Sequence, residues 1–303
     1  EKTRLGYHQP EETGIDPYKL QLIDTIIQEG LEKEAYPGGQ VIIAKDGMII
    51  YTKAFGYLDE TKKQKVTENT VYDLASASKA TGTLLSLMKS YDEGNYQLAN
   101  KISAFIPELK ESDKKDITIR DLLYHQSGLP ATIAFYEQAI HKDSYSGSLF
   151  SRKKDNSHPL QLDAYTYVNP NFRYNPAIVS GKRKQGFTTE AARDMYISDG
   201  FVTDSIIAGI KNSRMGASGK YVYSCVNFIL LKMMVERQTG EQMDQYLSNH
   251  FLAPLGASST SYNPLRKMDS LLIAPTENDR FIRKQIIRGY VHDEAAAFQG
   301  GVS

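Results

Sequence analysis

The pair of side chains best suited to nucleophilic chemistry lies in DLASASKATG, residues 73–82, where Ser76 precedes Lys79 by three positions. On a helix, residues at this spacing share one face, with Cβ atoms about 5–6 Å apart. A neutral lysine at that distance can take the proton of a serine hydroxyl, and burial or nearby positive charge favours the neutral form of a lysine. A serine in the first helical turn also lies beside free backbone N–H groups, which can stabilise an oxyanion. The chemistry indicated is acyl transfer through a serine.

The spacing alone is not specific, because Ser-x-x-Lys occurs four times, as Ser76/Lys79, Ser86/Lys89, Ser112/Lys115 and Ser151/Lys154. The last two pairs lie among charged residues, where a lysine stays solvated and protonated. Ser86 lies in the middle of a predicted helix, whose backbone N–H groups are already used. Ser76 combines an apolar approach (VYDLA), small neighbours and the first turn of a predicted buried helix. On these arguments alone, a simple helix-capping role for Ser76 stays open as the alternative.

Composition excludes several classes of protein. Lys plus Arg and Asp plus Glu both number 36, so no global field attracts nucleic acid. A single cysteine excludes an internal disulfide framework, and no apolar run is long enough to form a transmembrane segment. The polar start, EKTRLGYHQP, predicts a mature or excised N-terminus rather than a signal peptide. The six histidines lack metal-ligand spacing, so no metal site is predicted.

The first elements that must position Ser76 are two helices and a hairpin. Residues 15–31 carry a helix start and apolar residues at helical spacing. Two β-rich runs within residues 38–57 flank Asp46-Gly47, a strong signal for a hairpin turn. Residues 76–92 form a predicted helix with little polar face, which we expect to be buried.

The later elements are mostly helical in pattern. A second helical set begins within residues 116–130. Residues 141–200 lose periodicity and become rich in Ser, Asn, Pro and Tyr, which predicts a functional or disordered loop. A clear helix follows from Val226 and stops at Gly240, and another begins at Met243.

Several ordered stretches resemble one known family. They are VIIAKDGMIIYTKAFGYLD, VYDLASASKATG, ITIRDLLYHQSGLP, YSCVNFILLKMMVERQTG, FLAPLGASSTSY and VHDEAAAFQGGVS. Together these stretches resemble the serine β-lactamase and penicillin-binding-protein superfamily, in particular its class C-like, β-lactamase-related branch, of which the Ser-x-x-Lys signature is typical. The resemblance extends over most of the chain and outweighs the helix-capping alternative for Ser76.

The resemblance implies roles for three residues. Ser76 would be the acylated nucleophile, with its backbone N–H as half of the oxyanion hole, and Lys79 would be its activating base. Tyr223 would pass a proton to the leaving group or from the incoming water. Tyr167-Val-Asn169 is a competing Tyr-x-Asn match, but no amphipathic helix follows it, so Tyr223 is preferred.

Two departures from the family pattern bear on activity. Cys225 stands where the family has Asn or Asp, and a thiol is a weaker hydrogen-bonding partner for substrate than an amide. A role for Cys225 as a small buried hydrophobe is favoured over a nucleophilic one. The third family motif, Lys-Thr-Gly or His-x-Gly, is absent, so we expect a longer natural chain, and an inactive molecule if it ends at Ser303. His125 is expected to have a structural, hydrogen-bonding role.

The fold class implied is α/β, in the two-part α+β arrangement of β-lactamases and transpeptidases, with an antiparallel sheet flanked by helices. We expect one domain over residues 1–303, C-terminally incomplete, with the last strands of the sheet missing. Residues 1–75 and 286–303 would form the sheet side. Residues 76–285 would form a mostly helical part with an irregular insertion at 141–200.

The function implied is that of a serine hydrolase working through an acyl-enzyme on Ser76, without metal or organic cofactor. Its substrates would be D-Ala-type cell-wall peptides, β-lactams or related esters and amides, met outside the cytoplasm in the periplasm or at the cell surface. An attached glycosidase domain is a further expectation, and nucleic acid is not an expected partner. The alternatives are a catalytically silent peptidoglycan-binding or scaffolding domain, which Cys225 and the missing motif favour slightly, and a carboxylesterase of the same fold.

Overall fold

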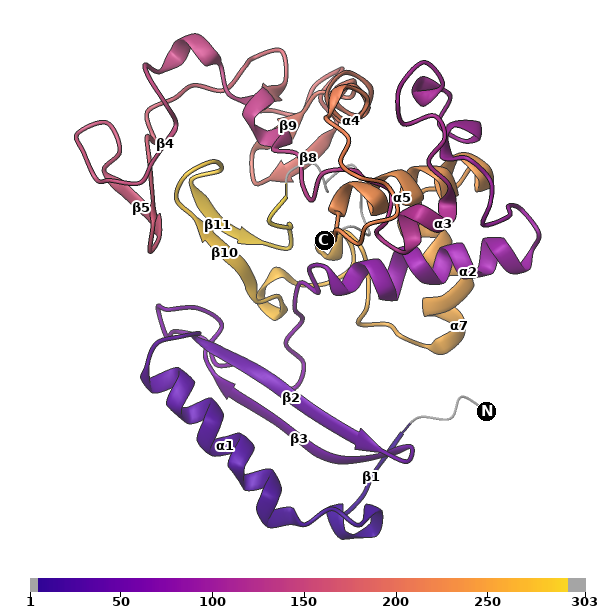
Figure 1. Ribbon diagram of the computed structural model, residues 1–303. Coiled ribbons are helices and arrows are strands. Elements are labelled where there is room, and N and C mark those ends of the chain that lie inside the picture. Colours follow the sequence, from indigo (N-terminus) through magenta and orange to yellow (C-terminus); the bar gives the residue numbers. More distant parts are fainter. Residues whose placement is uncertain (1–4, 294–303) are drawn as a thin grey trace.

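The N-terminal part of the chain forms a layer of one sheet and one helix (Figure 1). In the computed structural model, which describes residues 5–293, this layer contains β1 Gly6–Tyr7, α1 Pro17–Glu32, β2 Gly38–Lys45 and β3 Met48–Gly56. The strand order is β1-β3-β2, with β2 antiparallel and β1 parallel to β3. The helix and the hairpin predicted from the sequence are both confirmed.

Local chemistry explains where these elements begin and turn. The Asp16 carboxylate caps α1 by accepting a hydrogen bond from the N–H of Tyr18 at 2.9 Å. Asp46 and Gly47 have φ values of 52° and 78°. Positive φ at both central residues is the requirement of a type I′ turn, whose twist matches that of paired antiparallel strands.

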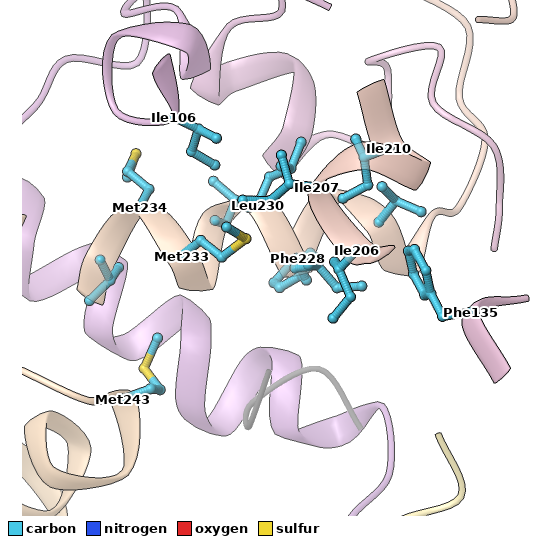
Figure 2. Close-up of a cluster of buried hydrophobic side chains, with 14 of the residues drawn as sticks. Ile106, Phe135, Ile206, Ile207, Ile210, Phe228, Leu230, Met233, Met234 and Met243 are labelled. Carbon is cyan, nitrogen blue, oxygen red and sulfur yellow. The ribbon is translucent and has the colours of Figure 1, made fainter. Parts of the chain in front are cut away.

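A single buried helix, α5 Cys225–Thr239, forms the centre of the rest of the molecule, and every residue from 226 to 235 is buried. It contacts α2 Leu85–Asp92, α3 Ile119–Leu123, α6 Met243–Leu247 and the π-helical segment η2 Lys79–Leu84. The other helical segments of this part are α4 Ala208–Asn212, α7 Ala253–Leu255 and the π-helical η7 Val202–Ile207 and η8 Ser248–Leu252. Short 3₁₀ turns are η1 Pro10–Thr13, η3 Ile102–Ala104, η4 Pro107–Leu109, η5 Phe135–Ala139, η6 Lys142–Ser144, η9 Pro264–Arg266 and η10 Ser270–Leu272. Figure 2 shows Ile207 of η7 beside Leu230 of α5 within this core.

Six short strands lie in the stretch where the sequence shows no periodicity. One three-stranded antiparallel sheet contains β4 Phe150–Ser151, β6 Thr166–Val168 and β5 Leu160–Asp163 in that order, and a second contains β7 Val179–Ser180, β9 Met195–Ile197 and β8 Thr189–Ala192. The expectation that residues 141–200 form an irregular loop is therefore wrong. Strands of two to four residues are too short to show an alternating pattern.

A last hairpin lies mostly within the part that was expected to be helical. It pairs β10 Pro275–Asp279 with β11 Gln285–Arg288 in antiparallel fashion. Residues 286–288, expected on the sheet side of the fold, thus pair within this hairpin, while residues 294–303 lie outside the described residues. The architecture is mixed α/β, as expected. None of the helices in the described part is long and apolar enough to cross a bilayer.

Candidate active site

Ser76 lies on a tight turn directly before the helical residues that lead into η2. The Asp73 carboxylate accepts a hydrogen bond from the N–H of Ala75 at 2.8 Å, and the N–H of Ala77 donates to the carbonyl of Leu74 at 3.0 Å. Ala75 has a φ of 45°, in the left-handed region that costs a residue with a Cβ about 1–2 kcal/mol. Such strain persists where surrounding bonds impose it, and it is frequent at active sites.

The helix after Ser76 differs from the one expected at 76–92. It runs first as the π-helical η2 and then as α2. Leu87 is 1% exposed whereas Met88 is 59% exposed, so the expectation that this helix is buried on nearly all sides is wrong. π-Helical turns inside α-helices are rare and often mark functional sites.

Ser76 and Lys79 are in contact. Lys79 Nζ lies 3.0 Å from Ser76 Oγ, which is hydrogen-bond distance. The Ser76 residue is exposed, whereas Lys79 is only 4% exposed. Among the described residues, the backbone N–H of Ser76 has no acceptor, so it is available to a substrate oxygen. The pair thus combines an accessible hydroxyl with a buried amine.

The other Ser-x-x-Lys pairs are used differently. Ser86 Oγ donates to the carbonyl of Gly82 at 3.0 Å, and Lys89 forms an ion pair with Glu93 at 2.8 Å. The serines of the remaining two pairs donate to nearby backbone carbonyls. Within residues 5–293, Ser76 is therefore the serine of the four that contacts its lysine.

Tyr223 joins this pair from a distant part of the chain. Lys79 Nζ lies 5.6 Å from the centroid of the Tyr223 ring. The structure thus brings together the three residues to which the resemblance gives catalytic roles. Tyr167, the competing tyrosine, lies on β6 in the small sheet β4-β6-β5.

His125 holds the segment that carries Tyr223. Its carbonyl accepts a hydrogen bond from the N–H of Val222 at 2.8 Å, and its Nδ1 accepts one from the N–H of Ser224 at 3.1 Å. The His125 and Tyr223 rings pack with centroids 4.7 Å apart. Burial, and then the positive charge of Lys79, hold the pKa of His125 below its usual value. The hydrogen-bonding role predicted for His125 is confirmed.

Asn227 connects His125 to the core and was missed from the sequence. Asn227 is fully buried, and its Oδ1 accepts a hydrogen bond from Ser127 Oγ at 2.7 Å. Its Nδ2 donates to the Leu122 carbonyl at 3.1 Å and lies 3.1 Å from His125 Nδ1. Buried amides are nearly always hydrogen-bonded. The sequence signal that could have indicated Asn227 is its amide side chain, which stands among the apolar residues of the predicted helix.

Cys225 is the first residue of α5. It is partly buried and packs against the core around α5, and its N–H donates to the Ala131 carbonyl at 2.9 Å. This environment agrees with the interpretation of Cys225 as a small hydrophobe. A contact between Cys225 and substrate stays a prediction.

Ser76 does not line either of two hollows found among the described residues. Their volumes are about 800 and 590 Å³. The smaller one borders the same helix through Ser78, Thr81 and Gly82. Within residues 5–293, no group of His, Cys, Asp and Glu side chains is arranged to hold a metal ion.

A family model described as Beta-lactamase matches residues 23–155 and 179–278. The chain belongs to the beta-lactamase family. Ser76, Lys79 and Tyr223 lie inside the matched segments, whereas Tyr167 lies in the unmatched segment between them. The β2–β3 hairpin and α5 also lie inside the matched segments, in agreement with the family resemblance of their sequences.

Curated relatives and solved structures agree with this membership. A protein of Escherichia coli K12, provisionally named a D-alanyl-D-alanine carboxypeptidase, is 28% identical over 99% of this chain, and one of Salmonella agona with the same name is 27% identical over 97%. The chain spans 62% of the length of these relatives. A class C beta-lactamase in complex with cefoxitin has a TM-score of 0.59 at 20% identity, covering 94% of this chain and 61% of its own. An octameric penicillin-binding protein homologue from Pyrococcus abyssi has the same score and identity, covering 93% and 52%. At this identity the structures show a shared fold.

Proposed function

We propose that this chain carries the acylation site of a serine hydrolase, with Ser76 as the nucleophile. The observation that carries the proposal is the 3.0 Å contact between Ser76 Oγ and the Nζ of Lys79, a lysine that is 4% exposed. Membership of the beta-lactamase family supports it, as does the provisional carboxypeptidase name of the relatives.

In the first step, Lys79 in its neutral form takes the hydroxyl proton of Ser76 while Oγ bonds to the substrate carbonyl carbon. The carbonyl electron pair moves onto oxygen, and the free N–H of Ser76 donates a hydrogen bond to this oxyanion. As the tetrahedral intermediate collapses, the bond to the leaving nitrogen breaks, and that nitrogen takes a proton from Tyr223. Tyr223 regains a proton from the Lys79 ammonium, which lies next to its ring.

Water then hydrolyses the acyl-enzyme by the reverse proton path. It loses a proton toward Lys79 and Tyr223, adds to the ester carbonyl and expels Ser76 Oγ, which regains its hydrogen. The products are a free carboxylic acid and the original enzyme. Every step uses side chains and backbone groups of the chain.

The substrates proposed are D-Ala-type cell-wall peptides, β-lactams or related esters and amides. The relatives' name points to a peptide ending in D-alanyl-D-alanine. Such peptides lie outside the cytoplasmic membrane, so the proposal includes an activity in the periplasm or at the cell surface. In this proposal Cys225 contacts the substrate through a weak donor, so binding of an amide group is weaker than with Asn. An attached glycosidase domain stays a prediction.

Intact-mass spectrometry of the full-length protein tests this proposal. The protein is incubated with benzylpenicillin and, separately, with p-nitrophenyl acetate, beside Ser76→Ala and the matched control Ser86→Ala. We expect a covalent adduct in the parent protein and in Ser86→Ala, and none in Ser76→Ala. Reaction with the ester alone would indicate a carboxylesterase. A folded protein that forms no adduct, or an adduct that persists in Ser76→Ala, would overturn the proposal and favour a silent peptidoglycan-binding domain.

A further inference from the structure

The backbone N–H groups of the two residues next to Tyr223, Val222 and Ser224, both donate to His125. The N–H of Val222 donates to the His125 carbonyl, and the N–H of Ser224 donates to His125 Nδ1. The imidazole also packs on the Tyr223 ring, with centroids 4.7 Å apart and planes inclined by 40°. One residue thus restrains Tyr223 on both sides of its backbone and on one side of its ring.

These contacts determine which nitrogen of His125 carries a proton. A backbone N–H can only donate, so the N–H of Ser224 requires Nδ1 to be an acceptor. The Asn227 amide nitrogen also faces Nδ1, at 3.1 Å, because Asn227 Oδ1 is occupied by the Ser127 hydroxyl. Nδ1 is therefore unprotonated, and the proton of the neutral ring is on Nε2.

Protonation of Nδ1 would place a third donor against the two that already face this nitrogen. The new N–H would face the N–H of Ser224 and the amide of Asn227. The ring would also carry a positive charge with its centroid 4.7 Å from that of Tyr223, and Lys79 already disfavours a charge there. Among the groups whose contacts with His125 the structure defines, the titratable ones are Lys79, Tyr221 and Tyr223, while α5 presents uncharged Asn227 and Phe228. No carboxylate among these compensates the charge.

We propose that His125 is a positioning residue for Tyr223, and that it acts as the neutral tautomer with its proton on Nε2. The inference rests on the proposed function, since positioning matters for catalysis only if Ser76 is acylated. In this arrangement the neutral ring keeps the Tyr223 segment against Lys79. Protonation of His125 releases the N–H of Ser224, the segment shifts, and acylation slows.

The expected pH dependence follows from the lowered pKa of His125. The neutral form is favoured in the fold by burial and by Lys79. The acylation rate should therefore be at its full value at neutral pH. It should fall as the pH drops through the pKa of His125, which lies below the ordinary histidine value of about 6.5. The stabilising contribution of the Ser224 hydrogen bond is lost over the same range.

Two substitutions separate positioning from simple packing. His125→Asn keeps an acceptor oxygen near the place of Nδ1 and tolerates the φ of 55° at this position, but it removes the ring and cannot titrate. His125→Leu removes both ring and acceptor. A matched control is His250→Asn, which removes a ring that packs against Tyr246 outside the site, with centroids 4.4 Å apart and planes inclined by 50°.

The experiment measures the acylation rate of the full-length protein by p-nitrophenyl acetate from pH 4.5 to 8, with folding followed by circular dichroism. The lower pH limit is about two units below the ordinary histidine pKa of about 6.5, and the upper limit is about one and a half units above it. We expect the acylation rate to fall roughly 10- to 100-fold in His125→Leu, because a small misplacement of a catalytic group has an effect of this size. The rate should fall less in His125→Asn, and the decrease in rate at low pH that His125 titration causes (the acid limb) should be absent from that variant. In the Tyr223→Phe background the His125 substitutions should have little further effect. An unchanged acid limb in His125→Asn would overturn the proposal. So would His125 substitutions that reduce the acylation rate by the same factor in the Tyr223→Phe background as in the parent protein.

A second measurement does not depend on activity. Nitrogen-15 spectra of the histidine rings report the tautomer of His125 directly, with His125→Asn to assign the signal. We expect an unprotonated Nδ1 at neutral pH, and Tyr223 ring signals that shift with the His125 titration. A proton on Nδ1 would contradict the inference. If Ser76 formed no acyl-enzyme while these spectra agreed, the proposed function would fail and the Tyr223 restraint would remain.

Discussion

Tyr223 contributes two separate things to the site. Its ring contacts both the Lys79 amine and the His125 imidazole, and its hydroxyl is the proton donor of the proposed mechanism. Tyr223 is 42% exposed, so a substrate that approaches from solvent can reach this residue. The ring and the hydroxyl can be tested independently, because phenylalanine keeps the first and removes the second.

Tyr223→Phe should therefore slow acylation strongly while leaving the fold intact. Loss of a positioned proton donor typically costs about 10²- to 10⁴-fold in rate, and rapid-mixing kinetics with p-nitrophenyl acetate would measure it. Tyr221→Phe is the matched control, since the Tyr221 ring also packs near His125, at 6.0 Å, and is 68% exposed. Similar rates in Tyr223→Phe and Tyr221→Phe would move the proton-transfer role to another group.

At the scale of elements, the β2–β3 hairpin depends on its turn. Gly47 has a φ of 78°, whereas Gly39, within β2, has no positive φ and has open space where a Cβ would lie. The two glycines belong to the same hairpin and differ in the conformation that each must adopt. They form a matched pair for measuring the contribution of the turn.

Gly47→Ala should lower the free energy of unfolding by about 1–2 kcal/mol, because a Cβ is strained in the left-handed region. Gly39→Ala should change it little, since the added methyl group meets no atom within 4 Å. Urea denaturation followed by circular dichroism gives both values. Equal losses in the two variants would mean that the turn conformation does not limit the stability of this layer.

The length of an element decides how far the sequence predicts it. α1, the β2–β3 hairpin and α5 are long and have clear caps or turn residues, so their patterns predict them well. The strands β4 to β9 contain too few residues to show a period, and their pairing is set by contacts between distant segments. The π-helical form of η2 leaves no mark in its composition.

The residues of the candidate site that belong to a sequence motif were predictable. The features of the site that depend on packing were not. Ser76, Lys79 and His125 stand in recognisable stretches of sequence. The left-handed φ of Ala75 was not predictable, because alanine has no preference for that region and the Asp73 carboxylate imposes the turn. The distances that join Tyr223 to Lys79 depend on the folded core and cannot be read from spacing.

At the scale of the whole molecule, Arg283 ties the last hairpin to the rest. Its side chain is 1% exposed and forms ion pairs with Asp279 at 3.2 Å and with Glu277 at 3.0 Å. It also donates to the carbonyls of Val291 and Ala191, the second of which lies on β8. Burial alone would raise the pKa of the Asp279 carboxyl, but hydrogen bonds from backbone N–H groups and the Arg283 guanidinium hold it below its usual value.

Arg283→Met should lower the free energy of unfolding by about 3 kcal/mol at neutral pH, because it leaves the mostly buried carboxylate of Asp279 without its cation. A carboxyl with a depressed pKa stabilises the fold above its unfolded pKa of about 4 and loses this contribution as pH falls. The difference between the parent protein and Arg283→Met should therefore narrow as pH falls through the folded pKa of Asp279. Denaturation at several pH values measures it, with exposed Arg280→Met as control. A difference that stays constant with pH would exclude the Asp279 pair as its source.

The two hydrogen bonds that His125 receives from the chain around Tyr223 also affect how this segment moves. The N–H groups of Val222 and Ser224 both donate to His125. Each must lose this hydrogen bond before it exchanges, and a movement of His125 or of the whole segment breaks both bonds together. Their hydrogens should exchange with water through a single shared opening, although Tyr221 and Tyr223 beside them are exposed. We therefore expect this segment to open cooperatively, so that Tyr223 moves together with the N–H groups of Val222 and Ser224.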